Sequence, residues 1–352
     1  MTVPRVAASR TDEELEALAA RLSNAGRWGP ADELGTLNHI TADKRIEAAA
    51  LVRSGLAISL ARPLVRESAP TSAVELDRRL MAVGLPDERS GLPPFAADYL
   101  GLETHQQGVT HLDAVGHVGG ADGSAYGGRP FAEALDDEGL RFGSVFAQRD
   151  GIVSRGVLLD VPAALGVAWL EPTHEISPAD LESAERHAGL RLGRGDVLVL
   201  RAGIEARERA MAPSALGPGP GPDAAAWMHD REIAVYAGDA SEHITSIGAR
   251  ILGRAAPGGE GGGGGADGGE PGGADGGVGG GGRAAGTTVT RFPLAFHQLA
   301  LAAMGLVLLD HLRVEPLARL CGDLRRYDFL FVAAPLALPG GTGSPVNPLA
   351  IF

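Results

Sequence analysis

The chain is almost free of cysteine: its 352 residues include a single one, Cys321. One cysteine excludes a disulfide framework within the chain and any cysteine-rich zinc module. Clusters of basic residues are also missing, and the formal net charge is −13. The sequence therefore predicts no nucleic-acid partner and no binding to an anionic membrane surface.

Long apolar runs are absent as well. No stretch is long enough to span a bilayer, and the N-terminus lacks a basic segment followed by an apolar one. These two absences predict a cytoplasmic protein. Hydrophobic residues still make up 44% of the chain, which is enough for a sizeable buried core. The length fits one large domain or two ordinary ones.

Glycine is abundant and is concentrated in one place. Residues 257–286 are more than half glycine, with interspersed acidic residues and few side chains to bury. Such a segment cannot offset the entropy lost on ordering, so we expect a disordered insertion here. It does not resemble a phosphate-binding loop, because no Gly-Lys-Ser or Gly-Lys-Thr follows it.

A short segment with two histidines and a carboxylate is the main candidate for a functional site. Its polar side chains, Gln107, His111, Asp113 and His117, all occupy odd positions, and apolar residues lie between them. Residues of equal parity share one face of an extended chain, whereas a helix would scatter them. The spacing predicts a strand that runs into a tight turn at Gly116 and presents these groups on one side.

Neutral imidazole and carboxylate together are a natural ligand set for Zn²⁺, Mn²⁺ or Fe²⁺. A catalytic site of this kind keeps one position open for a water molecule. His117 is then either a further ligand or a group that moves protons. The alternative is that His111 and His117 are ordinary hydrogen-bonded histidines beside an aspartate in a loop.

Hydrophobic periodicity and capping residues predict the regular elements. Thr11 followed by Glu14 is a capping-box pattern at the start of a helix. The predicted helices span 11–22, 41–52, 177–188, 223–236, 292–309 and 317–324, and a short strand is an alternative for the end of 292–309. The predicted strands span 56–60, 156–161, 196–200 and 329–333. Residues 65–94 show no clear period and predict a surface loop or an excursion near the site. Because helices and strands are mixed without steady alternation, we expect an α/β fold of one domain.

The segment Thr110–His117 resembles the signature of the metal-dependent cyclase family, which includes bacterial kynurenine formamidases and isatin hydrolase. The similarity continues at Trp28–Asn38, at Gly195–Leu198 and over the tail Phe329–Pro348. It implies a swivelling β/β/α fold with a barrel-like β core flanked by helices. That domain would span 28–352 and follow an N-terminal helical extension of residues 1–27. Family members commonly form homodimers or larger homo-oligomers, so the resemblance implies the same here.

The resemblance also implies further ligands. His297 and Asp310 occupy the places of a late histidine and a following acidic residue, usually glutamate, which complete a two-metal site in kynurenine formamidases. The family's first histidine is replaced here by Gln107, whose amide oxygen suits Mn²⁺ or Mg²⁺ better than Zn²⁺. His105 has the same parity and is the alternative for that place, although its spacing differs. We therefore expect one or two divalent ions, Zn²⁺ or Mn²⁺, held by the residues His111, Asp113, Gln107, His297 and Asp310.

The function implied is that of a metal-dependent amidohydrolase acting on a small aryl formamide or cyclic amide through metal-activated water. Hydrolysis of N-formylkynurenine to kynurenine and formate, a step of tryptophan catabolism, is the first expectation. His117 would carry the proton from water to the leaving amine. The alternatives are an isatin-like lactam hydrolase, a lyase or cyclase on the same site, and a non-catalytic binding protein for small molecules with a decayed metal site.

Overall fold

The computed structural model describes residues 10–65, 76–84, 93, 95–212, 214–245 and 290–352. The insertion expected at 257–286 lies outside the described residues. Within them, no helix combines the length and the apolar composition needed to cross a membrane.

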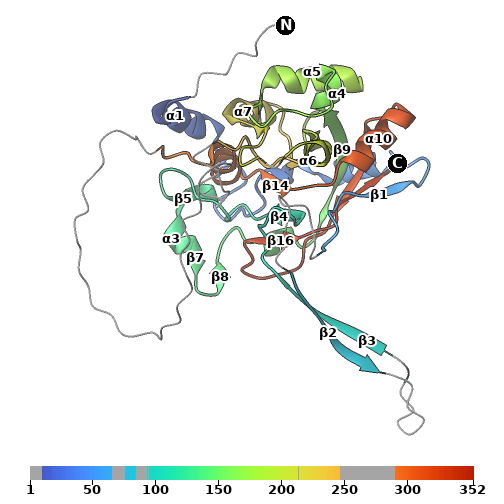
Figure 1. Ribbon diagram of the computed structural model, residues 1–352. Coiled ribbons are helices and arrows are strands. Elements are labelled where there is room, and N and C mark those ends of the chain that lie inside the picture. Colours follow the sequence, from blue (N-terminus) through green and yellow to red (C-terminus); the bar gives the residue numbers. More distant parts are fainter. Residues whose placement is uncertain (1–9, 66–75, 85–92, 94, 213, 246–289) are drawn as a thin grey trace, which may run out of the picture.

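A curled sheet of nine strands forms the centre of the molecule (Figure 1). Its middle strands β9, β11, β13 and β14 are parallel, and the remaining neighbours pair antiparallel. In spatial order the strands are β1 (Ala57–Ser59), β17 (Leu349–Ile351), β15 (Asp328–Ala333), β9 (Ile152–Asp160), β11 (Val197–Arg201), β13 (Val235–Gly238), β14 (Val307–Asp310), β4 (His111–Asp113) and β16 (Gly343–Pro345). The parallel strands are rich in Val and Leu because both of their faces are buried.

Helices and short 3₁₀ turns surround this sheet. The α-helices are α1 (Asp12–Leu22), α2 (Ala42–Ala49), α3 (Phe131–Ala134), α4 (Val161–Leu165), α5 (Pro178–Ala188), α6 (Ile204–Ala210), α7 (Pro222–Asp230), α9 (Ala295–His297) and α10 (Glu315–Leu324). The helix α9 continues as one π-helical segment, η4 (Gln298–Met304). The 3₁₀ turns are η1 (Gly35–His39), η2 (Tyr126–Gly128) and η3 (Val145–Gln148). The expected α/β fold, a curled sheet flanked by helices, is confirmed.

Two hydrophobic clusters cover the two faces of the sheet. In β14, Leu308 belongs to the cluster that contains residues of α1, α5, α7 and η4, whereas Val307 and Leu309 belong to the other. This follows from the alternation of side chains along a strand. Asp310 has the same parity as Leu308 and therefore lies on the face covered by α9 and η4.

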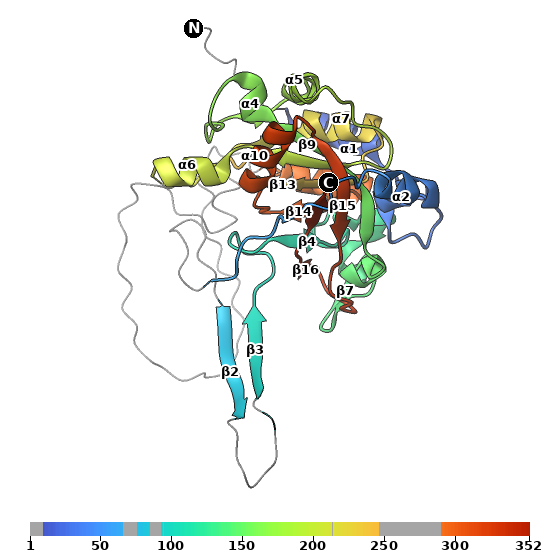
Figure 2. The ribbon, with the colours of Figure 1, turned by 90° about the vertical axis from the view of Figure 1, so that its right-hand side faces the viewer.

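A long hairpin departs from this body. Strands β2 (Leu76–Gly84) and β3 (Phe95–Leu102) pair antiparallel and extend away from the sheet in both views (Figures 1 and 2). A loop at Leu76–Gly84 is therefore wrong, because this segment is a strand, whereas the alternative of an excursion from the body fits the hairpin. The segment shows no period because the described side chains of β2 are largely exposed, from Arg78 to Met81. Three smaller two-stranded sheets are β5 (Ser124–Ala125) with β6 (Arg129–Pro130), β7 (Leu135–Asp136) with β8 (Gly139–Leu140), and β10 (Glu175–Ile176) with β12 (Gly219–Pro220).

The first predicted helix is confirmed, including its capping box. Thr11 accepts a hydrogen bond from the backbone N–H of Glu14, and the Glu14 carboxylate accepts one from the N–H of Thr11. Leu15, Leu18 and Leu22 of α1 are buried in the main cluster. The N-terminal helix thus packs as part of the body.

Two predicted helices end earlier than expected. The helix expected over 223–236 ends at Asp230, and Tyr236 lies in β13. The helix expected over 292–309 ends at Met304, where Gly305 adopts a left-handed conformation (φ 63°). The chain then enters β14, which is the short strand that the sequence allowed at this end. Apolar periodicity alone does not distinguish a buried helix from a buried strand that follows it closely.

Gly305 gives a test of this packing. A Cβ at this position would lie 2.5 Å from Cε2 of Tyr126 and 2.9 Å from the backbone of Gly35. We expect Gly305→Ala to destabilise the protein by about 3 kcal/mol, because the left-handed conformation and the contacts both penalise a side chain. Thermal unfolding would show a midpoint several degrees lower.

The matched control is Gly322→Ala in α10, where a Cβ meets nothing within 4 Å. There the same exchange should gain about 0.5–1 kcal/mol, since alanine favours a helix interior. Equal midpoints for the two variants would contradict the packing described for Gly305.

Candidate metal centre

Strand β4 carries the two central residues of the candidate site. It lies between β14 and β16, and its His111 is paired with Asp310 while Asp113 is paired with Leu308. Directly paired residues of antiparallel strands project to the same face. His111, Asp113 and Asp310 therefore point to one side of the sheet, and Leu112 fills the core on the other. All three polar side chains are buried.

The first group of ligand atoms gathers around one oxygen of Asp113. Oδ1 of Asp113 lies 2.9 Å from Nδ1 of His105 and 3.4 Å from Nε2 of His111. His105 comes from the segment that follows β3, and its Nε2 lies 3.1 Å from the hydroxyl of Thr342. These three residues form a cluster that could hold a metal ion.

The second group gathers on the other oxygen. Oδ2 of Asp113 lies 3.7 Å from Nε2 of His297, which is 3.3 Å from Oδ2 of Asp310. The remaining oxygen of Asp310, Oδ1, is buried and has no hydrogen-bond partner in the described part of the chain. A buried carboxylate oxygen without a partner is costly, and a cation would satisfy it.

Hydrogen bonds orient two of the histidines. Nδ1 of His111 donates to the carbonyl of Val109 at 2.8 Å, and Nδ1 of His297 lies 2.7 Å from Oε2 of Glu242. Each bond assigns a proton to Nδ1, so Nε2 is the nitrogen that each ring turns toward Asp113. The backbone N–H of His297 also donates to Glu242. Sequence reasoning missed Glu242, because it is 55 residues from His297 and no local spacing links them.

The electrostatics of the cluster favour positive charge. Burial alone would raise the pKa of Asp113, but the surrounding imidazoles, above all that of His117, hold it well below its usual value. Desolvation acts to lower the pKa of His297, yet its bonds to Asp310 and Glu242 raise it well above that of free imidazole. Burial lowers the pKa of His117 to about 4, against the opposing effect of Asp113. Carboxylates on several sides of one ring make this a place that attracts a cation.

The donor set fits a divalent metal. In a tetrahedral zinc site with bonds of about 2.0–2.1 Å, ligand atoms lie about 3.4 Å apart. The separations of 3.3, 3.4 and 3.7 Å within the two groups are close to that value. The shorter 2.9 Å between His105 and Asp113 is a hydrogen bond. Asp113 contributes one oxygen to each group and is the residue that the two groups share.

The structure does not place all the predicted ligands together. His111, Asp113, His297 and Asp310 meet, but Gln107 instead lines a neighbouring pocket. The prediction assumed that side chains alternate between two faces from position 107 onward. This fails because β4 begins only at His111 and a turn precedes it. His105 contacts Asp113 in its place.

His117 lies beside the cluster. Its ring stacks on that of His105, with centroids 3.8 Å apart and planes inclined by 6°. From the sequence, His117 was either a further metal ligand or a group that moves protons. In the structure it belongs to neither of the two groups of ligand atoms. Its place against His105 suits a group that exchanges protons near the centre.

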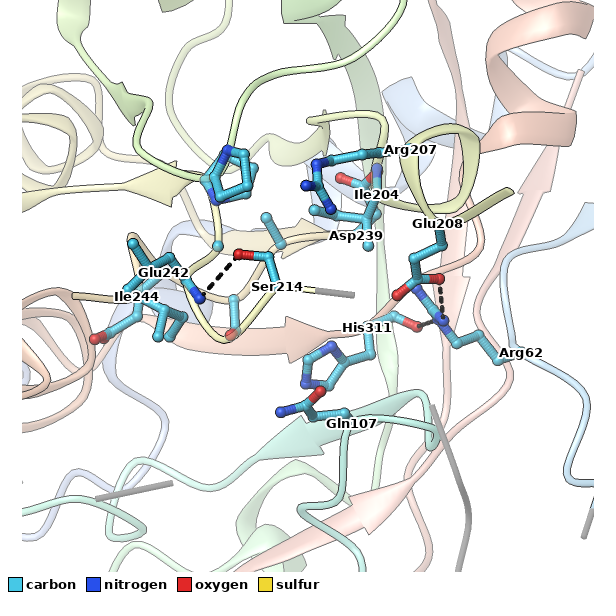
Figure 3. Close-up of a pocket in the computed structure, with 16 residues that line it drawn as sticks. Arg62, Gln107, Ile204, Arg207, Glu208, Ser214, Asp239, Glu242, Ile244 and His311 are labelled. Atoms are coloured by element: carbon cyan, nitrogen blue, oxygen red, sulfur yellow. Dashed lines mark hydrogen bonds and ion pairs between the residues drawn. The ribbon is translucent and has the colours of Figure 1, made fainter. Parts of the chain in front are cut away.

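A pocket adjoins the centre (Figure 3). His311, whose ring lies 5.6 Å from that of His111, and Gln107 line one side of it. Glu242, the partner of His297, lines another part, and residues of α6 close the opposite side. A small molecule in this pocket would therefore lie next to the candidate ligands.

Residues 38–242, more than half of the chain, match a family model described as "Putative cyclase". The chain belongs to the cyclase family. The match includes β4 and Glu242, whereas His297 and Asp310 lie beyond it.

One solved structure agrees with this assignment. A crystal structure described as a novel cyclase is 25% identical, with a TM-score of 0.73 over 95% of this chain and 99% of that one. Isatin hydrolase A of Labrenzia aggregata is 16% identical (TM-score 0.49; 86% and 94% covered), and that of Ralstonia solanacearum is 17% identical (TM-score 0.49; 87% and 94% covered). No curated protein sequence matches the chain significantly.

The two candidates for the first ligand can be separated by mutation. We expect His105→Ala to weaken Mn²⁺ or Zn²⁺ binding about 10-fold or more, because it removes an imidazole next to Asp113. Gln107→Ala should leave the affinity within about 3-fold. Calorimetric titration of metal-free protein measures both, and the reverse order would restore Gln107 as the ligand.

A second titration tests whether Asp113 bridges two ions. Asp113→Asn should weaken every metal site on the chain, since both groups share its carboxylate. Asp310→Asn should affect only one site. Asp122→Asn, which changes a carboxylate bonded only to nearby Ser124, is the control. Equal losses from Asp113→Asn and Asp310→Asn would argue for a single ion.

Proposed function

We propose that this chain is a metal-dependent hydrolase that cleaves the C–N bond of a small amide. The observation that carries the proposal is the buried carboxylate of Asp113, whose two oxygens face two separate groups of ligand atoms. Membership of the cyclase family supports the same reaction class. A purely structural cluster would not need a buried oxygen of Asp310 that lacks a partner.

In this proposal His105, His111 and Asp113 hold one divalent ion, and Asp113, His297 and Asp310 hold a second. Bound there, such an ion polarises the amide carbonyl and lowers the pKa of a water molecule. The chain's own contribution is to hold a proton on Nδ1 of His111 and His297 through the bonds to Val109 and Glu242, which directs Nε2 of these two rings toward Asp113. Because the pKa of His297 is raised, its Nε2 would give up a proton when an ion binds.

His117 transfers the proton from water to the leaving amine. Its lowered pKa keeps the imidazole neutral at pH 7, so it can accept a proton from water. The stack with His105 fixes the ring beside the centre, from where the proton passes to the leaving amine. The residue thus acts as base first and as acid second.

N-formylkynurenine is the proposed first substrate, with kynurenine and formate as products. Its hydrolysis would place the protein in tryptophan catabolism. A cytoplasmic location and a homodimeric or larger assembly stay predictions from the sequence.

The assay follows directly. Protein loaded with Mn²⁺ or Zn²⁺ should release formate from N-formylkynurenine, and removal of the metal with a chelator should abolish the release. Isatin and simple lactones, assayed side by side, are the comparison substrates. Ring opening of isatin without release of formate would contradict the proposed substrate. Fully loaded protein inactive on the whole panel would contradict the hydrolase itself.

A variant tests the role of His117. His117→Ala should lower kcat about 100-fold or more, because a positioned acid–base group contributes that much, while the metal content stays unchanged. His187→Ala, which removes an exposed histidine next to Tyr327, is the matched control. Full activity of His117→Ala would exclude it from proton transfer.

A further inference from the structure

The pocket beside the centre is lined by five charged side chains, and four of them have partners within the protein. Arg62 pairs with Glu208 at 3.8 Å and also donates to the carbonyl of His311. Asp239 accepts hydrogen bonds from three consecutive backbone N–H groups at the start of α6. Glu242 holds His297. The remaining charged residue is Arg207.

Arg207 differs from the other four. One of its terminal nitrogens, Nη1, donates to the carbonyl of Ala212 at 3.3 Å, and Nε is buried without a hydrogen-bond partner. In the part of the chain that the structure describes, no carboxylate lies within 4.0 Å of this guanidinium, whereas Arg209 on the same helix pairs with Glu205. A guanidinium has five N–H donors, so most of those of Arg207 are unused.

The position of Arg207 relates it to the reaction. Figure 3 shows it at one side of the pocket, on α6, with His311 and Gln107 at the opposite side. His311 contacts His111, so the pocket extends from the unused cation toward the candidate metal centre. A substrate held at one end by Arg207 would present its other end to the ligands.

We propose that Arg207 binds a carboxylate of the substrate and selects carboxylate-bearing amides over neutral ones. This inference rests on the proposed hydrolase function and adds the substrate class to it. Guanidinium and carboxylate match as a pair of parallel hydrogen bonds, which gives both affinity and orientation. The acidic residues Glu208, Asp239 and Glu242 also line the pocket. They disfavour a doubly charged group such as phosphate and leave a single negative charge as the best match.

Binding of two probes of nearly equal size tests this without any turnover. Anthranilate carries a carboxylate, and 2-aminobenzamide carries a neutral amide in its place. Calorimetric titration of the metal-loaded protein should show anthranilate binding roughly 10- to 100-fold more tightly, as expected for a charge-assisted hydrogen-bonded pair. Arg207→Gln should remove this preference and leave the affinity for 2-aminobenzamide unchanged.

Two further variants complete the design. Arg209→Gln removes a positive charge from the same helix outside the pocket, and the preference should persist. Arg207→Met keeps the aliphatic stem of the side chain and should lose the preference as Arg207→Gln does, so either neutral variant suffices if the other does not fold.

Three results would overturn the inference. The first is an equal affinity of the wild type for anthranilate and 2-aminobenzamide. The second is a preference for anthranilate that survives in the Arg207 variants. The third is a loss of that preference in Arg209→Gln as large as in Arg207→Gln. Survival in the variants would mean that the metal binds the carboxylate. Inorganic phosphate binding more tightly than anthranilate, with the same dependence on Arg207, would overturn the choice of a carboxylate.

Failure of the proposed function is a separate outcome. It would appear as a lack of turnover on every amide while the binding preference remains. For an active enzyme, Arg207→Gln should raise KM for a carboxylate-bearing amide roughly 10- to 100-fold and leave kcat nearly unchanged.

Discussion

The burial of Asp113 is the constraint on which the site depends. A buried carboxylate is tolerated only when hydrogen bonds or opposite charge compensate for lost hydration. Here imidazoles of His105, His111 and His297 surround it, and its two oxygens face different neighbours. The chain brings these groups together from two segments far apart in the sequence, residues 105–113 and His297, so the site exists only in the folded protein.

The sheet supplies the required geometry. Strand β4 has only three residues, but it is held on both sides by β14 and β16, and this fixes its register. A shift of one residue would turn His111 and Asp113 into the core occupied by Leu112. Gly305 ends η4 shortly before the start of β14 and allows close contact with Gly35.

The sequence predicted this centre well where its strand is regular and poorly where it is not. Equal parity correctly placed His111 and Asp113 on one face, since they belong to the same strand. It failed for Gln107, because the chain turns before β4 and brings His105 to Asp113 instead. Resemblance to the family pointed to His297 and Asp310, which do meet Asp113. No local pattern could reveal Glu242 or Arg207, since their partners and pocket are formed by contacts between distant segments.

The two departures from the family's pattern are compensated within the fold. The imidazole missing at position 107 is supplied by His105, so the first group keeps two histidines and a carboxylate. Asp310 has a shorter side chain than the usual glutamate, but β14 pairs directly with β4 and places it opposite His111. Its carboxylate therefore reaches His297 at 3.3 Å without a longer arm. In a site that no longer bound a cation, buried polar groups without a partner would destabilise the fold. Such groups would then be the first to be replaced. Their retention in both groups argues that the centre still binds a cation.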